Sequence, residues 1–177
     1  MSGPPTTRLL ISRRRISSAV KRLARQISAD YQDKTPFIVG ILTGSFVFIA
    51  DLIRRLDIPL EVDFVQLSSY GIGTETSGKI SVIKGLKSPV TGRHVLVVED
   101  IVDTGLTVSY LLDILRRENP ASLKVCALTD KPSRRRMPLN IDYLGFTVPD
   151  KFIVGYGIDW NNRYRYLPDI CCVEFEE

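Results

Sequence analysis

Residues 94–107 have the sequence His94-Val-Leu-Val-Val-Glu-Asp-Ile-Val-Asp-Thr-Gly-Leu-Thr107. The run from Val95 to Val98 is aliphatic and β-branched throughout, which is typical of a strand buried on both faces of a parallel sheet. Two acids, Glu99 and Asp100, follow this run, and a turn of small and hydroxyl residues begins at Asp103. The order of these segments predicts a strand whose carboxyl end carries a polar turn.

A helix is predicted directly after this turn, because apolar residues recur at helical spacing at Val108, Leu111, Leu112 and Leu115. The first amides of a helix have no partner within it and lie at the positive end of its dipole, so they favour a bound anion. Thr104 and Thr107 add hydroxyls, and Gly105 allows close approach of the backbone. The turn is therefore a candidate phosphate site.

The two adjacent carboxylates need a different partner, since they would repel a phosphate. Vicinal sugar hydroxyls and a divalent cation both suit Glu99 and Asp100, which leaves Asp103 to face the reacting group. An aliphatic strand that ends in two acids also occurs in phosphate-accepting receiver domains. In a receiver that strand lies near the start of the domain, whereas here only 78 of the 177 residues follow Glu99.

The acid pair, the two apolar residues, Asp-Thr-Gly and the final threonine closely resemble the phosphoribosyl pyrophosphate motif of the type I phosphoribosyltransferases. Within that family, the flanking segments resemble the hypoxanthine-guanine phosphoribosyltransferases. These segments are, in chain order, Leu42-Thr43-Gly44-Ser45, Ser69-Tyr70, Lys131 and residues 149–159. The resemblance extends from about Phe37 to Val173.

The resemblance implies an α/β fold with a mainly parallel central sheet flanked by helices. We expect a single domain over residues 1–177, with a small hood from about residues 1–35 and 150–177 and a mobile lid at about 68–80. The implied reaction is the Mg²⁺-dependent transfer of the 5-phosphoribosyl group from phosphoribosyl pyrophosphate to N9 of hypoxanthine or guanine. It yields IMP or GMP and pyrophosphate, a step of purine salvage. Relatives are dimers or tetramers, so a homodimer or homotetramer is expected.

The resemblance also implies the residues that bind phosphoribosyl pyrophosphate, with Asp103 as the general base. Relatives have a cis peptide bond between Leu42 and Thr43, and several carry a basic residue where this chain has Thr43. One side-chain contribution to pyrophosphate binding is therefore missing here, although the backbone contribution remains. The implied binding residues are Thr43, Gly44, Glu99, Asp100, Asp103, Thr104, Gly105, Leu106, Thr107 and Arg165.

By the same resemblance, Lys131 donates to the 6-oxo group of the purine and so disfavours adenine. Phe152 stacks on the ring, and the backbone of Lys151 to Ile153 reads its edge. The remaining implied roles are metal binding by Glu99, Asp100 and Asp159, contact of Asp159 with the purine side of the site, and a lid root at Ser69 and Tyr70. Residues 134–136 are three arginines that we interpret as a solvated loop.

The composition is that of an ordinary globular protein, with 44% hydrophobic and 25% charged residues. No apolar run approaches the roughly 20 residues of a membrane helix, and no signal-peptide core precedes the domain. The three cysteines, Cys126, Cys171 and Cys172, lack metal-ligand spacing and are expected to be buried free thiols. These features favour the cytoplasm.

The N-terminal 35 residues contain eight Lys or Arg and two Asp, a local charge of +6, which leaves −2 for the remainder of a chain of charge +4. Such a segment could contact nucleic acid. However, apolar residues from Ile16 to Tyr31 recur at helical spacing, so we favour an amphipathic helix, capped by Ser12, with a solvated basic face. Two alternatives to an enzyme remain: a regulatory RNA-binding protein and a catalytically silent ligand sensor.

The other predicted elements follow from apolar runs and turn residues. His94, the only histidine, precedes the central strand and is interpreted as structural. A helix is expected over Phe46 to Leu56. Strands are expected over Phe37 to Leu42, Glu61 to Leu67, Ile80 to Ile83, Leu123 to Leu128, Ile141 to Val148, Phe152 to Tyr156 and Ile170 to Phe175.

Overall fold

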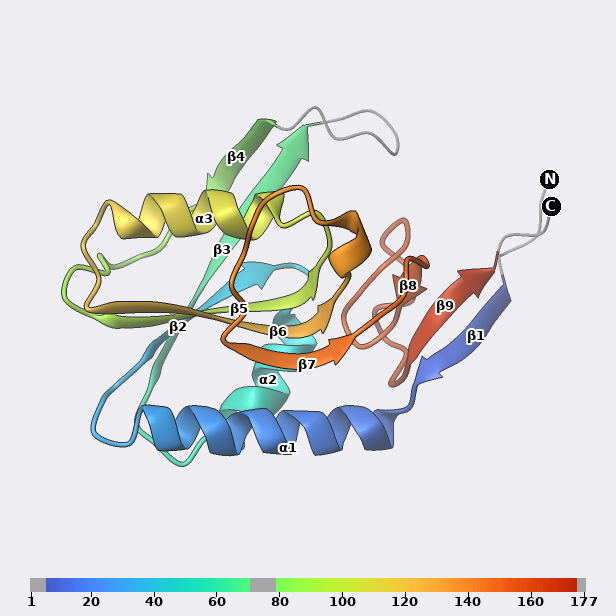
Figure 1. Cartoon of the computed structure of the whole chain (residues 1–177), viewed down its shortest axis with the longest axis horizontal. Coiled ribbons are helices and arrows are strands. Elements are labelled where there is room, and N and C mark those ends of the chain that lie inside the picture. The colour runs from blue at the N-terminus through green and yellow to red at the C-terminus, as the bar shows by residue number, and fades with distance from the viewer. Residues whose placement is uncertain (1–5, 71–78, 175–177) are drawn as a thin grey trace.

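A computed structural model of the chain describes residues 6–70 and 79–174, with only the backbone of Ser69, Tyr70 and Lys79. Its centre is a six-stranded sheet with the order β4–β3–β2–β5–β6–β7 (Figure 1). All neighbouring strands in it are parallel except β3 and β4. The bounds are β2 Phe37–Leu42, β3 Glu61–Tyr70, β4 Lys79–Lys84, β5 His94–Val102, β6 Ser122–Asp130 and β7 Tyr143–Thr147. The predicted α/β fold is confirmed.

Helices cover both faces of this sheet (Figure 1). The helices α1 (Arg13–Asp30) and α2 (Phe46–Ile53) share one apolar cluster with Leu96 and Val98 of β5. The helix α3 (Leu106–Arg116) shares the other cluster with Val95 and Val97. Successive side chains of a strand point to opposite faces, so the unbroken apolar run of β5 is what a strand between two helical layers requires.

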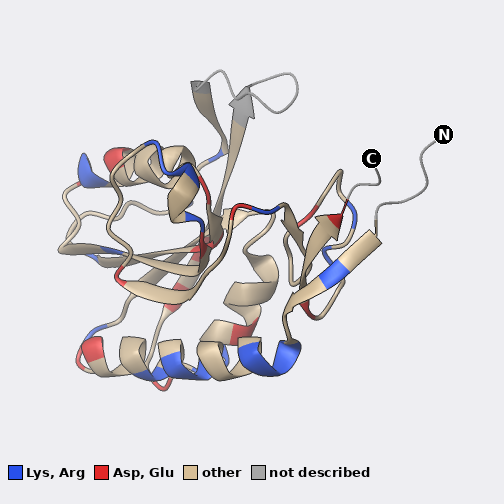
Figure 2. Cartoon of the chain, turned by 45° about the vertical axis from the view of Figure 1, so that its right-hand side comes forward, with Lys and Arg blue, Asp and Glu red and all other residues tan. Residues whose placement is uncertain are grey.

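Helix α1 is the amphipathic helix that the sequence predicts. The hydroxyl of Ser12 accepts a hydrogen bond from the Arg15 amide at 3.4 Å, and Ile16, Leu23 and Ile27 are buried. The basic residues of α1, blue in Figure 2, are exposed. Arg22 is not solvated in full as predicted for the basic face. Its Nη2 donates to the carbonyl oxygens of residues 144 and 145 in β7, at 2.9 and 3.2 Å.

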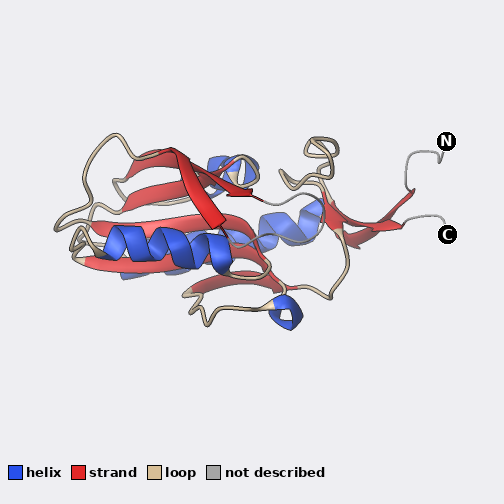
Figure 3. Cartoon of the chain, turned by 90° about the horizontal axis from the view of Figure 1, so that it is seen from above, coloured by secondary structure: helices blue, strands red, loops and turns tan. Residues whose placement is uncertain are grey.

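A second, three-stranded sheet extends from one end of the large sheet (Figure 3). Its order is β1–β9–β8, with β1 at Thr6–Ile11, β8 at Ile153–Val154 and β9 at Ile170–Glu174. Sequence analysis does not assign β1, whose antiparallel partner β9 lies at the other end of the chain. Among residues 6–35, β1 joins this small sheet, whereas α1 packs on the large one.

Several boundaries differ from prediction. Strand β5 continues through the two acids to Val102, because its pairing with β6 extends to the pair of Val102 and Asp130. Strand β8 is shorter than predicted, since Gly155 and Tyr156 adopt φ values of +98° and +52°, in the left-handed region. Helix α2 ends at Ile53 and not at Leu56. The expected lid lies mostly outside the described residues, because residues 71–78 are not described.

No helix in the described part of the chain has the length and apolar character needed to cross a membrane. His94 has a structural environment, as predicted: its Nδ1 lies 2.8 Å from the Ser122 hydroxyl, and its ring packs edge-on against Tyr31.

Candidate active site

The register of the sheet brings three loops to one edge. Gly40 of β2 pairs with Val98 of β5, so the chain leaves β2 beside Asp100. Next to it, the Lys131 amide donates to the Val102 carbonyl at 2.9 Å, which aligns the ends of β6 and β5. In open α/β sheets ligands bind outside the carboxyl ends of the strands. A ligand-binding site is therefore expected at this edge of the sheet.

A cavity of about 520 Å³ opens at this edge. It gathers most of the residues that the sequence singles out, from β2, β5, β6 and the segment after β7. The lining residues predicted from sequence are Thr43, Gly44, Asp100, Asp103, Thr104, Lys131, Phe152, Ile153, Asp159 and Arg165. Ile101, Arg134, Arg136 and Ile158 complete the lining. Glu99, Gly105, Leu106, Thr107 and Lys151 lie outside it.

The turn between β5 and α3 has the geometry of an anion cradle. Gly105 precedes the helix with φ +81°, a left-handed conformation that favours glycine, and the Ser109 amide donates to its carbonyl at 2.9 Å. The Thr104 carbonyl accepts from the amides of Arg136 and Met137 at 2.9 and 3.3 Å, which fixes the turn from behind. The first amides of α3 have no partner within the helix. That of Leu106 donates to the Thr104 hydroxyl at 3.4 Å, which leaves those of Thr107 and Val108 as candidates for a bound anion.

Glu99 and Asp100 point to opposite faces of β5, since they are adjacent in a strand. Asp100 lines the cavity, whereas Glu99 lies on the side of Val95 and Val97. Burial, and secondarily the Asp100 charge, raises the pKa of Glu99 well above its usual range. Burial also raises the pKa of Asp100 to about 6, against opposing backbone hydrogen bonds and the nearby Arg165.

The two acids could hold a metal only together with its other ligands. Within residues 6–70 and 79–174, no three His, Cys, Asp or Glu side chains come together as a metal cluster. Mg²⁺ commonly takes one or two carboxylates and completes its shell with water and substrate phosphates. The buried Glu99 Oε2 has no hydrogen-bond partner, and the Asp100 carboxylate faces the cavity. Of the two acids only Asp100 is therefore placed to bind a cation that arrives in the cavity with its phosphate ligands, because Glu99 lies on the opposite face of β5.

Backbone segments pack directly against one another beside Asp100. The peptide bond between Leu42 and Thr43 is cis, as the resemblance implies. A Cβ atom on Gly44 would overlap the Asp100 carboxylate, and a Cβ atom on Gly157 would overlap the Gly44 carbonyl. Gly157 also has φ +99°. Glycine at these two positions therefore allows the turn after β2, the Asp100 side chain and the segment around Gly157 to meet.

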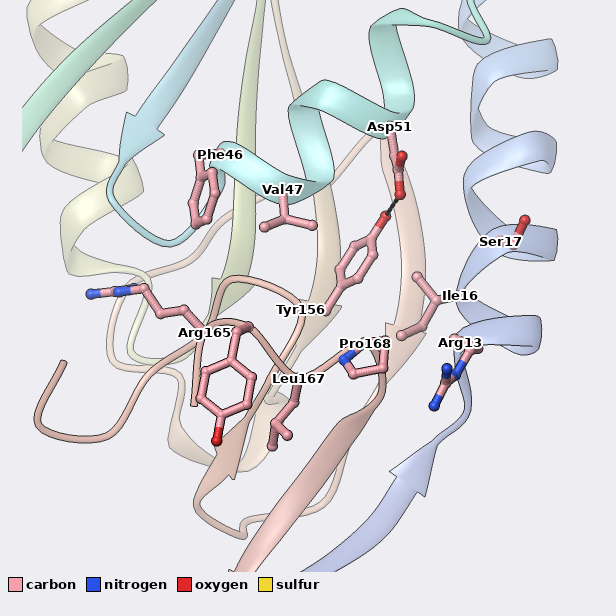
Figure 4. Close-up of a pocket in the computed structure, with 11 residues that line it drawn as sticks. Arg13, Ile16, Ser17, Phe46, Val47, Asp51, Tyr156, Arg165, Leu167 and Pro168 are labelled. Atoms are coloured by element: carbon pink, nitrogen blue, oxygen red, sulfur yellow. Dashed lines mark hydrogen bonds between the residues drawn. The ribbon is translucent and has the colours of Figure 1, made fainter. Parts of the chain in front are cut away.

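Helix α2 begins directly after the Thr43–Gly44 turn, and its Asp51 contacts the Gly155–Gly157 segment through Tyr156. The Tyr156 hydroxyl donates to Asp51 Oδ2 at 2.5 Å, beside a second hollow of about 460 Å³ (Figure 4). Arg54 forms an ion pair with the same aspartate, and Arg55 lies 3.7 Å from it. Burial and the hydrogen bond to Asp51 raise the pKa of Tyr156 above its usual range, so the phenol remains the donor.

Arg165 and Asp159 are paired with each other. Arg165 Nη2 lies 2.7 Å from Asp159 Oδ1, and its Nη1 donates to the Gly157 carbonyl at 2.8 Å. The second oxygen of Asp159 accepts from the Asn162 amide at 2.7 Å. In Figure 4 the Arg165 side chain extends away from the Asp51–Tyr156 pair. The side chains expected at the pyrophosphate and at the metal thus form one ion pair at the cavity wall.

The purine residues differ in their exposure. Lys131 is only 4% exposed although it lines the cavity, whereas Phe152 is 46% exposed. Lys151 is exposed outside the cavity, and its amide donates to the Pro149 carbonyl at 2.8 Å. The Phe152 carbonyl accepts from the Val173 amide at 2.8 Å, which connects this segment to β9. The buried Lys131 and the partly exposed Phe152 thus line the same cavity.

The interpretation of residues 134–136 as a solvated loop is incomplete: Arg134 and Arg136 are exposed, but the segment also contacts the site. Arg134 Nε lies 3.2 Å from Asp103 Oδ1, and Arg136 lines the cavity. Arg135 pairs with Asp130 and contacts the position where a Cβ atom of Gly105 would lie. Their place directly after Lys131, at the end of a strand parallel to β5, is the signal that could have identified them.

Comparison with known proteins agrees with this geometry. Residues 10–161 match the family model of the phosphoribosyl transferase domain. The hypoxanthine-guanine phosphoribosyltransferase of Bacillus subtilis is 46% identical over 163 residues, which cover 92% of this chain and 91% of the relative. That of Aquifex aeolicus is 45% identical over 168 residues, 94% of each chain.

The fold is also shared with solved structures. A crystal structure of a hypoxanthine-guanine phosphoribosyltransferase from Bacillus anthracis superposes with a TM-score of 0.89 at 44% identity, over 96% of this chain and 98% of that one. A hypoxanthine phosphoribosyltransferase from Staphylococcus aureus gives a TM-score of 0.90 at 40% identity, over 94% and 90% of the two chains. The chain therefore belongs to the phosphoribosyl transferase family, among relatives named hypoxanthine or hypoxanthine-guanine phosphoribosyltransferases.

Proposed function

We propose that this protein transfers the 5-phosphoribosyl group from phosphoribosyl pyrophosphate to N9 of hypoxanthine or guanine, with release of pyrophosphate. The products, IMP and GMP, make this a purine salvage reaction. The observation that carries the proposal is one cavity that joins the cradle before α3 to the buried Lys131 and the exposed Phe152. An anion site and a site for a planar ring that presents a carbonyl thus share one space.

Phosphoribosyl pyrophosphate would occupy the acidic and backbone-lined part of the cavity. The turn 104–107 would hold the 5-phosphate on the first amides of α3. The Thr43–Gly44 turn and Arg165 would bind the pyrophosphate, a role that suits the guanidinium fork. Asp100 would accept hydrogen bonds from the ribose hydroxyls, with Glu99 behind it. The burial of Asp100 at the cavity wall supports this role, because ribose hydroxyls would add hydrogen bonds to a carboxylate whose charge burial disfavours.

We also propose Mg²⁺ as the cofactor, held near Asp100 and Asp159, which line the cavity. Glu99, expected as a third ligand, lies on the opposite face of β5 and outside the cavity. When bound, the metal supplies positive charge that offsets the charge of the pyrophosphate leaving group. Asp100 is buried and lines the cavity, so a cation bound there would offset its charge.

The purine would lie between the ribose and Phe152. Lys131 donates to the 6-oxo group, and the backbone of Lys151 to Ile153 reads the ring edge. A lysine selects a carbonyl, because the amino group of adenine presents donors of its own. Phe152 supplies a ring face for stacking, and its 46% exposure supports that role.

In the reaction, the bond from C1 of the ribose to the pyrophosphate breaks, and the bond from C1 to the purine N9 forms. The ribose passes through a state like an oxocarbenium ion, so the protein acts by position and charge. Asp103, which lines the cavity next to the cradle, would take the proton from the five-membered ring as general base.

The test is direct. The protein is incubated with phosphoribosyl pyrophosphate, Mg²⁺ and, separately, hypoxanthine, guanine, xanthine or adenine, and nucleotide formation is followed by chromatography. We expect nucleotide from hypoxanthine or guanine and little from adenine. Failure with all four purines, or a preference for adenine, would contradict the proposal.

We further propose that the enzyme works in the cytoplasm as a homodimer or homotetramer. Free cysteines support a reducing compartment: Cys126 and Cys172 are buried thiols, and Cys171 is partly buried. The oligomeric state rests on the resemblance and is measured by sedimentation equilibrium.

A further inference from the structure

We infer that Arg134 is a positioning residue for Asp103: it holds one carboxylate oxygen, Oδ1, so that the other faces the purine. The inference rests on the proposed function, because it concerns how the proposed base is held in place. It assigns a role to an arginine that neither the sequence motif nor the expected substrate contacts include.

The two oxygens of Asp103 have different surroundings. The side chain is 38% exposed, yet Oδ1 is inaccessible to solvent and makes no hydrogen bond to the described residues. The exposure therefore belongs to the rest of the side chain, which lines the cavity. A carboxylate oxygen that loses water without gaining a donor needs a nearby positive charge. Arg134 Nε, 3.2 Å from Oδ1, supplies it.

Arg134 is itself held by the segment that carries the purine-reading lysine. It ends the short 3-10 helix Pro132–Arg134, and its amide donates to the Lys131 carbonyl at 3.2 Å. Its Nη1 lies 3.7 Å from Asp150 Oδ1, and Asp150 directly precedes the segment expected to read the purine edge. One guanidinium thus links the base, the lysine turn and the purine segment.

The value of this ion pair lies in orientation. Arg134 is 43% exposed, and an exposed ion pair contributes little to the free energy of folding. A general base, however, must lie within hydrogen-bond distance of the proton that it takes, and a misplacement of about 1 Å can cost about 10²-fold in rate. Arg134 fixes the rotation of the Asp103 carboxylate and leaves its free oxygen toward the cavity.

A different role would place Arg134 on a substrate phosphate. These two roles predict different kinetics, because a positioning residue acts through Asp103 and a phosphate ligand does not. A double-mutant cycle separates them. The variants are Arg134→Gln, Arg134→Lys, Asp103→Asn and the double variant Arg134→Gln/Asp103→Asn, each assayed for kcat and for KM of both substrates.

We expect Asp103→Asn to lower kcat by about 10² or more, as general bases typically contribute that much. We expect Arg134→Gln to lower kcat by about 10-fold or more, with the KM for phosphoribosyl pyrophosphate changed by less than about twofold. Arg134→Lys should recover part of the loss. The double variant should fall within about threefold of Asp103→Asn alone, since Arg134 has nothing left to position.

The matched control is Arg116→Gln. Arg116 pairs with Asp113 at 2.8 Å at the far end of α3, and its loss should leave kcat unchanged. Thermal unfolding of each variant checks the fold, and if Arg134→Gln does not fold, Arg134→Lys takes its place in the cycle. Three results would overturn the inference. They are a kcat loss in the double variant equal to the product of the two single losses, a raised KM for phosphoribosyl pyrophosphate in Arg134→Gln, or full activity of that variant. A wild-type protein that forms no nucleotide would instead refute the proposed function.

Discussion

The folded, ligand-free protein disfavours the charged form of Asp100. Burial raises the pKa of Asp100 from 3.8 to about 6, a change of about 3 kcal/mol. The folded state binds this proton more tightly than the unfolded chain. The group's stabilising contribution is therefore present when both states are protonated, and it is lost as the pH rises from 3.8 to about 6. Above about pH 6 the ligand-free protein is destabilised by the full free-energy cost of burying the Asp100 charge.

We expect Asp100→Asn to raise the thermal midpoint of the ligand-free protein at pH 8 by about 3–8 °C, since the amide has no charge to bury. The gain should be smaller at pH 5, and the variant should bind Mg²⁺ and phosphoribosyl pyrophosphate weakly. Calorimetry at the two pH values measures this. Asp113→Asn is the control, because Asp113 is 63% exposed. A gain at pH 5 that equals or exceeds the gain at pH 8 would show that burial of charge is not the cause.

Lys131 carries the second prediction at this scale. Lys131→Gln should lower kcat/KM for hypoxanthine by about 10²-fold and should narrow the gap between hypoxanthine and adenine, because the cationic donor for the 6-oxo group is gone. The KM for phosphoribosyl pyrophosphate should change little. Steady-state kinetics with each substrate varied in turn provide the values, and Lys21→Gln, on the exposed face of α1, is the control. Equal losses for both substrates would assign Lys131 to the phosphates or to the fold.

The residues of the site fall into two groups: some belong to one continuous sequence motif, and others depend on contacts with residues distant in the sequence. Asp103, Thr104 and Gly105 belong to one continuous motif, so the sequence could identify them. Arg134 could not be identified in this way, since its contact with Asp103 depends on the parallel register of β5 and β6. The same register buries Lys131 at the cavity wall.

At the scale of the elements, the strands of the large sheet could be predicted because most are nearly continuous apolar runs bounded by turn residues, while β3 shows alternating apolar and polar residues. Strand β1 could not, since it is stabilised by pairing with β9, more than 150 residues away. Strand β8 is short because the backbone turns at Gly155 and Tyr156, where positive φ values cannot be read from apolar periodicity.

The packing of these turns gives a prediction for Gly157. Gly157→Ala should lower the free energy of unfolding by about 2–4 kcal/mol, because the new methyl meets the Gly44 carbonyl and the backbone has φ +99°. It should also weaken pyrophosphate binding, since the Thr43–Gly44 turn must move. Urea denaturation and inhibition by pyrophosphate measure the two effects.

Gly85→Ala is the matched control for Gly157→Ala. Nothing lies within 4 Å of a Cβ atom placed on Gly85, so the free energy of unfolding should stay within about 0.5 kcal/mol of the wild type. If Gly157→Ala behaves like this control, the close approach of the two turns does not constrain the protein.

At the scale of the whole molecule, the cavity is assembled from parts that the chain keeps apart. The edge of the large sheet contributes Asp100, Asp103 and Lys131, while the segment leading to the small sheet contributes Phe152. The sequence indicates each part by its motif. Their arrangement, with the small sheet beyond the edge of the large one (Figure 1), depends on contacts between the two ends of the chain and is not contained in any single motif.

The distribution of charge over this assembly predicts the order of binding. Four carboxylates, of Glu99, Asp100, Asp103 and Asp159, lie in or beside the cavity. Two of them are paired, Asp103 with Arg134 and Asp159 with Arg165. Glu99 and Asp100 have no cationic partner in the ion pairs of the described residues, and the purine brings no cation. Mg²⁺ with phosphoribosyl pyrophosphate does, and its ribose would complete one wall of the purine pocket.

We therefore expect hypoxanthine to bind at least about 10-fold more tightly when Mg²⁺ and a non-reactive phosphoribosyl pyrophosphate analogue are present, within the usual range of coupling between two sites. Calorimetric titration of hypoxanthine, with and without the analogue, gives the two affinities. Because such coupling is reciprocal, hypoxanthine must tighten binding of the analogue by the same factor, which a second titration checks. Comparable affinity for hypoxanthine in both titrations would mean that the purine pocket is complete before phosphoribosyl pyrophosphate binds and that the order is not imposed by charge.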